Sequence, residues 1–342
     1  MTHEPYEMGG ESGNPEVSGL KTARKHFSKL GWGVFLILLA GTVAQVLAAV
    51  VEQLAFPGAS DGGWGFWLWA MVPLYLIGFP VGILVLRRAP GIRLERKDLK
   101  ISHLLILIPI SICMMYAGNL VGSLVNGLIR MVLGLPAADP VEDLVTGTEL
   151  LPRILFVVLL GPALEELVFR KMLIDRMAPY GEKTAVILSA LIFGLFHGNF
   201  AQLFYAAALG LVFGYVYLRT GKLRYSILLH AFINFMGGVV APAVLEGVPE
   251  EVMTGALEDL STAKILEALP GILAMYGYSL LMIGAAIAGL VLICVYRGKL
   301  LWKPAPQELP KKGRIKALCL NGGMLFLLLG CLVMIALSLF AE

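Results

Sequence analysis

Charged residues are scarce in this chain, and those present are clustered between long uncharged stretches. Only 15% of the 342 residues are Asp, Glu, Lys or Arg, whereas 58% are apolar. That balance excludes an ordinary soluble domain, whose surface needs many more charged side chains. The net charge of +3 says little by itself, because in a membrane protein the distribution of Lys and Arg among the loops matters, and nucleic acid is not implied as a partner. Most of the chain is therefore predicted to lie in lipid.

Cysteine and histidine are also rare. The cysteines fall inside apolar segments, without the spacing of a zinc knuckle or a disulfide framework, and we interpret them as small apolar side chains: Cys113, Cys294, Cys319 and Cys331. Of the five histidines, His3 and His26 lie in the polar N-terminal part and His103 at a predicted helix start. Only His197 and His230 are enclosed by apolar sequence.

The chain contains repeated apolar runs long enough to cross a bilayer, which requires about 20 residues in a helix. We predict spans near 31–52, 64–86, 103–133, 154–176, 184–200, 203–218, 226–245, 271–295 and 317–340. The predicted fold class is therefore all-α, a polytopic transmembrane bundle of about nine helices.

The loops between these spans alternate in charge. Basic residues gather in 21–29, 87–100, 171–183, 219–224 and 297–316, whereas 53–63 has none and 139–149 and 246–263 are acidic. By the positive-inside rule the N-terminus is cytoplasmic, and nine crossings put the C-terminus outside. The predicted location is the cell (inner) membrane, as a multi-pass protein.

The chain divides into four predicted parts and shows no inverted repeat. Residues 1–30 are predicted to be a flexible cytoplasmic tail, because the start is rich in Gly, Glu and Ser. Residues 31–149 and 246–342 form N-terminal and C-terminal transmembrane helices. Residues 150–245 form a core in which polar side chains are concentrated.

The first polar group of this core lies at 161–170. Polar side chains at membrane depth are costly unless paired, so they indicate function. Glu165 and Glu166 point about 100° apart on a helix, and Glu166 can pair with Arg170 at i,i+4, which leaves Glu165 to face the bundle interior. Pro162 predicts a kink or a new helix start one turn earlier. The alternative is a helix end that simply emerges into water.

Two more polar groups follow on separate helices. Phe193 and His197 share one helix face at i,i+4, and so do His230 and Asn234. One intramembrane histidine is more often a packed hydrogen-bond partner than a functional group. Two of them near a glutamate pair favour a site.

Small and amide residues near these groups leave two interpretations open. Glycines on the predicted fifth and sixth helices either bring polar side chains together or serve ordinary helix packing: Gly194, Gly198, Gly210 and Gly214. Asn199 and Gln202 either line the site or cap a helix.

This set of side chains can hydrolyse a peptide bond. Glu165 can act as general base and then acid, and His197 can hold the attacking water or a metal that acidifies it. His230 and Asn234 can donate to the oxyanion, where one preorganised donor contributes about 3 kcal/mol. Two histidines and a carboxylate also make an incomplete zinc shell, with His197 and His230 as ligands. The HExxH spacing is lacking, so a divalent metal such as zinc and no metal both stay open.

The three motifs, in order, resemble the CPBP family of intramembrane proteases, which includes the type II CAAX prenyl proteases and bacterial Abi or bacteriocin-immunity proteins. The resemblance covers roughly 150–245. It implies a membrane endopeptidase with a site open toward the cytoplasm, with or without metal. The family's functional residues map onto Glu165, His197, His230 and Asn234, and we count Glu166 with these candidate catalytic residues.

The remaining motif positions have supporting roles in this interpretation. The arginine of the first motif maps onto Arg170, a structural partner of Glu166, and Phe193 supports His197. One feature fits poorly: counted from Thr184, His197 would lie about 20 Å from the cytoplasmic face, whereas His230 would be shallow. Helix tilt, or a fifth helix that begins outside the lipid, must bring the two together.

The predicted partners are the lipid bilayer and a membrane peptide or protein, either prenylated or a bacteriocin, leader or membrane peptide. Two other functions compete with proteolysis. A non-catalytic immunity or scaffold protein would share the fold. A proton-coupled transporter could use buried Glu and His residues as a relay, but would need a polar path across the membrane.

Overall fold

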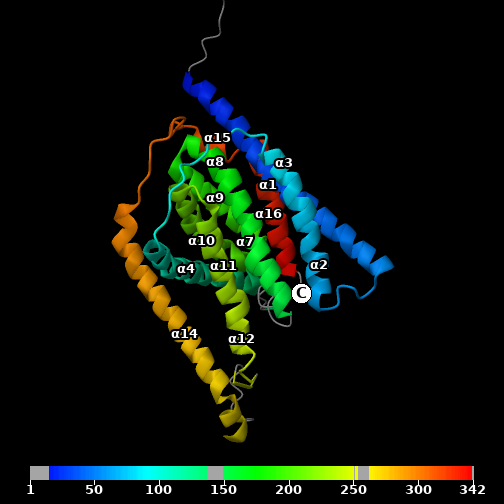
Figure 1. Cartoon of the computed structure of the whole chain (residues 1–342). Helices are drawn as coiled ribbons and strands as arrows, with labels where there is room; N and C mark the ends of the chain where they lie inside the picture. Colours follow the sequence, from blue (N-terminus) through cyan, green and yellow to red (C-terminus); the bar gives the residue numbers. More distant parts are fainter. Residues whose placement is uncertain (1–14, 137–148, 250, 253–261, 341–342) are drawn as a thin grey trace, which may run out of the picture.

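The computed structural model describes residues 15–136, 149–249, 251–252 and 262–340 of the chain. Within these ranges every regular element is a helix or helical turn, and there is no strand. Figure 1 shows the helices gathered side by side into one bundle. The predicted all-α class and the multi-pass membrane architecture are confirmed.

The N-terminal part supplies three long helical spans. The first is α1 (Pro15–Ala55), and the second joins α2 (Gly63–Pro73), a wide π-helical turn η1 (Leu74–Gly78) and α3 (Phe79–Leu86). The third is α4 (Ile101–Leu133).

The predicted flexible tail is wrong for residues 15–30, because α1 already begins at Pro15. Ala23, Phe27 and Leu30 lie one turn apart on this helix and are completely buried. The polar composition of the segment hides this apolar face. Residues 1–14 of the predicted tail lie outside the described residues.

The central part is built from one interrupted helix and three further helical segments. The interrupted helix comprises α6 (Leu150–Arg153), η2 (Ile154–Leu160), α7 (Gly161–Glu166), η3 (Leu167–Ile174), α8 (Asp175–Met177) and η4 (Ala178–Tyr180). The others are α9 (Glu182–Phe196), α10 (Phe200–Thr220) and the run of α11 (Leu223–Phe235), η5 (Met236–Val240) and α12 (Ala241–Leu245).

The C-terminal part covers two different faces of the bundle. It comprises α14 (Thr262–Tyr296), η7 (Arg297–Lys299), α15 (Arg314–Leu318) and α16 (Gly322–Phe340). Helix α16 packs against α1, whereas α14 lies along the outside against α4 (Figure 1). In their most apolar windows 50% of α10 but only 11% of α14 is buried, so α14 presents most of its apolar surface to lipid.

Seven helices of the described residues are long and apolar enough to span a membrane. They correspond to seven of the nine predicted spans. The other two, at 154–176 and 184–200, are helical but do not reach that threshold. The first carries six charged residues between Glu165 and Arg176, and α9 has only 15 residues.

The basic segments lie together at one end of the molecule, as their common charge predicts. His26 donates to the carbonyl of Arg176, and the amide of Ile92 donates to the carbonyl of Asp175. Two more basic stretches join them through backbone bonds: Lys97 N–H to Thr220 O, and Gln307 N–H to Pro179 O. Figure 1 shows α8 and α15 at this end, near the start of α1.

Three of the wide turns share one cause. Turns η1, η2 and η5 each precede an α-helical segment whose second residue is proline: Pro80, Pro162 and Pro242. Proline has no N–H, and its ring clashes with the carbonyl four residues earlier, so the turn before it opens. The opened turn leaves backbone carbonyls for side-chain donors. Turn η2 directly precedes α7, the short helix that carries Glu165.

Candidate active site

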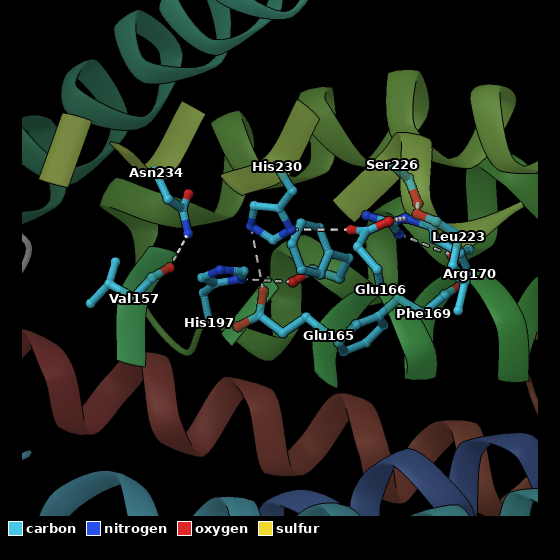
Figure 2. Close-up of polar contacts among 12 residues, drawn as sticks. Val157, Glu165, Glu166, Phe169, Arg170, His197, Leu223, Ser226, His230 and Asn234 are labelled. Atoms are coloured by element: carbon cyan, nitrogen blue, oxygen red, sulfur yellow. Dashed lines mark hydrogen bonds and ion pairs between the residues drawn. The ribbon is translucent and has the colours of Figure 1, made fainter. Parts of the chain in front are cut away.

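The two adjacent glutamates serve different partners, as the helical geometry predicts. Glu166 is fully buried, and its Oε2 accepts a hydrogen bond of 3.0 Å from Nε of Arg170. Glu165 is partly exposed and its carboxylate faces the imidazole of His230, with 3.7 Å between Oε2 and Nε2. Figure 2 shows the Glu165 carboxylate turned toward the rings of both His197 and His230.

Arg170 binds Glu166 inside the bundle and is itself held by further contacts. Its Nη1 donates to the hydroxyl of Ser189 over 3.3 Å, and that hydroxyl donates to the carbonyl of Phe169. Its Nη2 has no hydrogen-bond partner in the described part of the chain. The guanidinium instead lies 4.6 Å from the centre of the Phe193 ring, a favourable cation–π arrangement.

His230 connects the two glutamates. Its Nδ1 lies 3.2 Å from Oε1 of Glu166, and its ring stacks on Phe213 with 5.2 Å between the centroids. Because the Glu166 carboxylate pairs with an arginine and can only accept, the proton of a neutral His230 ring belongs on Nδ1. In that state Nε2 and Oε2 of Glu165 are two acceptors facing each other, which a water molecule or an additional proton can bridge.

His197 ends α9 at the C-cap, directly before Gly198, whose φ of 68° makes the turn into α10. Its Nδ1 donates to the carbonyl of Phe193 over 2.8 Å, because a carbonyl can only accept. This leaves Nε2 as the free acceptor of the neutral ring. The Phe193 ring contacts both imidazoles, with centroid distances of 4.9 Å to His197 and 5.7 Å to His230. The expected difference in depth does not keep the two histidines apart.

Asn234 binds the opened turn before the glutamates. In the i→i+5 pattern of η2 the carbonyl of Val157 would accept from residue 162, which is proline and has no N–H. The Nδ2 of Asn234 donates to this carbonyl over 2.9 Å (Figure 2). Since a side-chain amide has two N–H groups, one remains for another acceptor.

The open interpretations of the neighbouring residues can be read from their contacts. Asn199 caps α10, because its Oδ1 accepts from the amide of Gln202 over 2.8 Å. Gly194 and Gly210 lie where two helices approach closely, because an added Cβ would collide with the backbone of Leu203 and Ala190 respectively. His26 lies on α1 and binds the carbonyl of Arg176, and His103 lies in the first turn of α4.

The residues predicted to hold a metal are His197 and His230, beside the carboxylate of a glutamate. The Nε2 atoms of both rings and the Glu165 carboxylate are the donors that remain after the contacts above. In the part of the chain that the structure describes, no group of three or more His, Cys, Asp or Glu side chains is arranged to hold a metal ion. This donor set does not fit a bound metal as it stands, and the divalent metal stays a prediction.

Sequence reasoning missed two contacts of the site. Ser226 contacts the Glu166 carboxylate, and Tyr75 binds the opened turn through the carbonyl of Phe156. Ser226 precedes His230 by four residues, so the spacing Ser226, His230, Asn234 on one face was an available signal. Tyr75 had only a weak signal, a hydroxyl within an apolar span.

Comparison with known proteins gives a match in this same region. Residues 147–236 match a family model described as "Type II CAAX prenyl endopeptidase Rce1-like". The segment is similar to that family, as the three motifs predicted. It contains every predicted site residue from Glu165 to Asn234.

A curated relative matches over a similarly short stretch. The "Putative membrane peptidase YdiL" of Bacillus subtilis (strain 168) is 34% identical over 80 residues, which cover 22% of this chain and 32% of the relative. The chain therefore spans about a third of the length of this relative. No solved structure matches the chain.

Proposed function

We propose that this protein is an intramembrane endopeptidase that hydrolyses a peptide bond of a membrane-associated peptide or protein. One observation carries the proposal: the Glu165 carboxylate lies 3.7 Å from Nε2 of His230, and Glu166, itself paired with Arg170, holds the other side of that ring. A carboxylate beside two imidazoles in an apolar bundle has the groups that peptide hydrolysis requires. The Rce1-like match over the same residues supports this assignment.

In the proposed reaction Glu165 takes a proton from a water molecule as the water oxygen attacks the peptide carbonyl carbon. Nε2 of His197 accepts the hydrogen bond of the remaining water proton and orients the nucleophile. The carbonyl oxygen becomes an oxyanion, which the second N–H of Asn234 and the Nε2–H of His230 stabilise. In this proposal His230 carries the additional proton that bridges it to Glu165 in the resting site, and keeps that proton throughout the reaction. Glu165 then gives its proton to the departing amine as the C–N bond breaks.

Glu166, Arg170 and Phe193 act in this proposal without touching the substrate. Glu166 fixes the direction of the His230 ring, Arg170 keeps Glu166 ionised and in place, and Phe193 separates and orients the two imidazoles. Hydrolases commonly hold a catalytic histidine in one tautomer through a carboxylate that accepts from its ring N–H. Here Glu166 would be that carboxylate, and Arg170 would hold Glu166 in place.

The test is cleavage by the purified full chain in lipid vesicles, with a prenylated CAAX peptide and a panel of hydrophobic peptides as substrates. Products are identified by mass spectrometry. We expect Glu165→Gln to lower the rate by about 10³-fold, the loss of a general base. Glu267→Gln, on the exposed side of α14, is the matched control and should cleave normally.

Other outcomes distinguish the competing functions and substrates. Cleavage that survives in Glu165→Gln removes the proposed base. Binding of peptides without cleavage would favour an immunity or scaffold protein, and proton flux would favour a transporter. Within the panel, a preference for the prenylated peptide would assign the CAAX-type substrate.

Metal dependence and orientation are tested on the same preparation. If a divalent metal is bound, a chelator should abolish cleavage and zinc should restore it. We also propose that the end carrying the basic segments faces the cytoplasm. A cysteine introduced at Lys100 should then react with an impermeant thiol reagent only from the cytoplasmic side.

A further inference from the structure

Tyr75 comes from a part of the chain that the family match does not cover. It lies in the wide turn η1 of the second span, 72 residues before residue 147, where the match begins. Its hydroxyl donates to the carbonyl of Phe156 over 3.1 Å. Its ring also packs against Phe156 and Phe79, with centroid distances of 6.1 Å and 5.9 Å.

The bond of Tyr75 falls on the opened turn that precedes Glu165. The Phe156 carbonyl already accepts the N–H of Gly161, so the tyrosine adds a second bond to it. The next carbonyl, that of Val157, is the one that Asn234 binds. Two side chains from separate helices thus hold consecutive carbonyls of a turn that the following proline prevents from closing.

Gly161 brings the tyrosine close to the candidate base. A Cβ added at Gly161 would lie 2.9 Å from the Phe156 carbonyl oxygen, 3.2 Å from the Tyr75 hydroxyl and 4.0 Å from Oε1 of Glu165. Apart from Gly161, its two chain neighbours and the neighbouring backbone of its own helix, the three atoms nearest to that point are all oxygens. Because glycine has no side chain, the tyrosine hydroxyl and the glutamate carboxylate can both approach the helix at this position.

We propose that Tyr75 is a positioning residue for Glu165. Its hydrogen bond to Phe156 fixes the opened turn η2 and thereby the direction in which the first turn of α7 projects the Glu165 carboxylate. The inference rests on the proposed function, because it assigns Tyr75 to the proposed general base. If Tyr75 has this role, the second N-terminal span contributes a residue to the proposed active site.

The chain contains a matched case that lacks the nearby glutamate. In η5 the carbonyl of Met236 accepts the N–H of Ala241 and also the hydroxyl of Tyr278, over 3.0 Å. This repeats the arrangement of Phe156, Gly161 and Tyr75. Both tyrosines are half-buried, and each donates its hydroxyl to a backbone carbonyl of a wide turn. Removing either hydroxyl therefore breaks the same kind of bond.

The kinetic test compares wild type, Tyr75→Phe and Tyr278→Phe, each as the full chain in vesicles with the best-cleaved peptide. A misplaced base slows the chemical step and leaves substrate binding intact, so we expect Tyr75→Phe to lower kcat about tenfold with KM within about twofold. Tyr278→Phe should keep both values. Equal kcat in Tyr75→Phe and wild type, or an equal loss in both variants, would overturn the inference.

A second measurement does not need cleavage. Loss of one hydrogen bond on a turn should raise amide hydrogen exchange locally by about fivefold. We expect this at 156–166 in Tyr75→Phe and at 236–242 in Tyr278→Phe. Unchanged exchange at 156–166 would overturn the inference even if the protease is active. A wild type that cleaves none of the peptides would overturn the proposed function, and the inference with it.

Discussion

Two networks of charged side chains, each with an acidic residue paired to an arginine, lie in opposite surroundings in this protein. In the site, the side chains of Glu166 and Arg170 are 0% exposed and bind each other, and Glu166 also binds His230. At the basic end, Asp98 is 72% exposed and binds Lys222 and Arg224, with Tyr225 beside them. Only the first network lies inside the bundle.

The difference shows that burial decides what such a network does. Water and dissolved ions replace the partners of an exposed ion pair, so removing one member changes little. A buried charge that loses its partner has nothing to replace it, and the remaining ion is strongly destabilising. A buried network therefore holds its members in one geometry, which is what the proposed role of His230 beside Glu165 requires.

The largest expected effect comes from breaking the buried pair. Arg170→Met leaves Glu166 buried and unpaired, so we expect the free energy of unfolding to fall by about 3 to 5 kcal/mol. Denaturant titration of the protein in detergent measures it. Arg224→Met is the matched exposed control and should not shift the midpoint. Equal shifts in the two variants would show that burial is not the deciding difference.

A smaller effect is expected when the buried carboxylate loses its charge but keeps its shape. In Glu166→Gln the new side-chain amide can still accept from Nδ1 of His230 but no longer holds the ring as an ion does, so kcat should fall about 100-fold. Peptide cleavage by the reconstituted protein measures this, with Asp98→Asn as the control of unchanged activity. Full activity in Glu166→Gln would remove Glu166 from the proposed site.

The smallest effect is expected at the exposed network and depends on pH. Hydrogen bonds from Lys222 and Tyr225 lower the pKa of Asp98 below its ordinary value of 3.8. A lowered folded-state pKa means that ionised Asp98 stabilises the fold above pH 3.8, and that this contribution is lost as the pH falls through the folded-state pKa. The thermal midpoints of wild type and Asp98→Asn should differ slightly at neutral pH and converge in acid. A gap that widens in acid contradicts this sign.

The features that were predictable from the sequence depend on neighbours along the chain. A helix places residues i and i+4 on one face, which is why the Glu166–Arg170 pair and the separate direction of Glu165 follow from spacing alone. Apolar length locates the spans, and the distribution of Lys and Arg groups the loops at one end. Composition failed at residues 15–30, where an apolar face was hidden among polar residues.

The contacts that complete the candidate site join residues far apart in the chain. His230 meets Glu166 across 64 residues, Asn234 meets Val157 across 77, and Tyr75 meets Phe156 across 81. Motif spacing does not contain these pairings, because they depend on how the helices pack against one another. The weak signals that existed, such as Ser226 on the face of His230, indicate a helix face but not its partner.

The sequence by itself determined a membrane-spanning helical chain, the helices that carry the polar groups, and the different directions of two adjacent glutamate side chains. Those properties arise from hydrophobic length and helical periodicity, which are local. Only the tertiary structure decided that His230 lies between Glu165 and Glu166, and that Tyr75 and Asn234 hold the turn that Pro162 opens. A backbone carbonyl freed by proline must find a donor inside the bundle, and which side chain reaches it depends on the packing of separate helices.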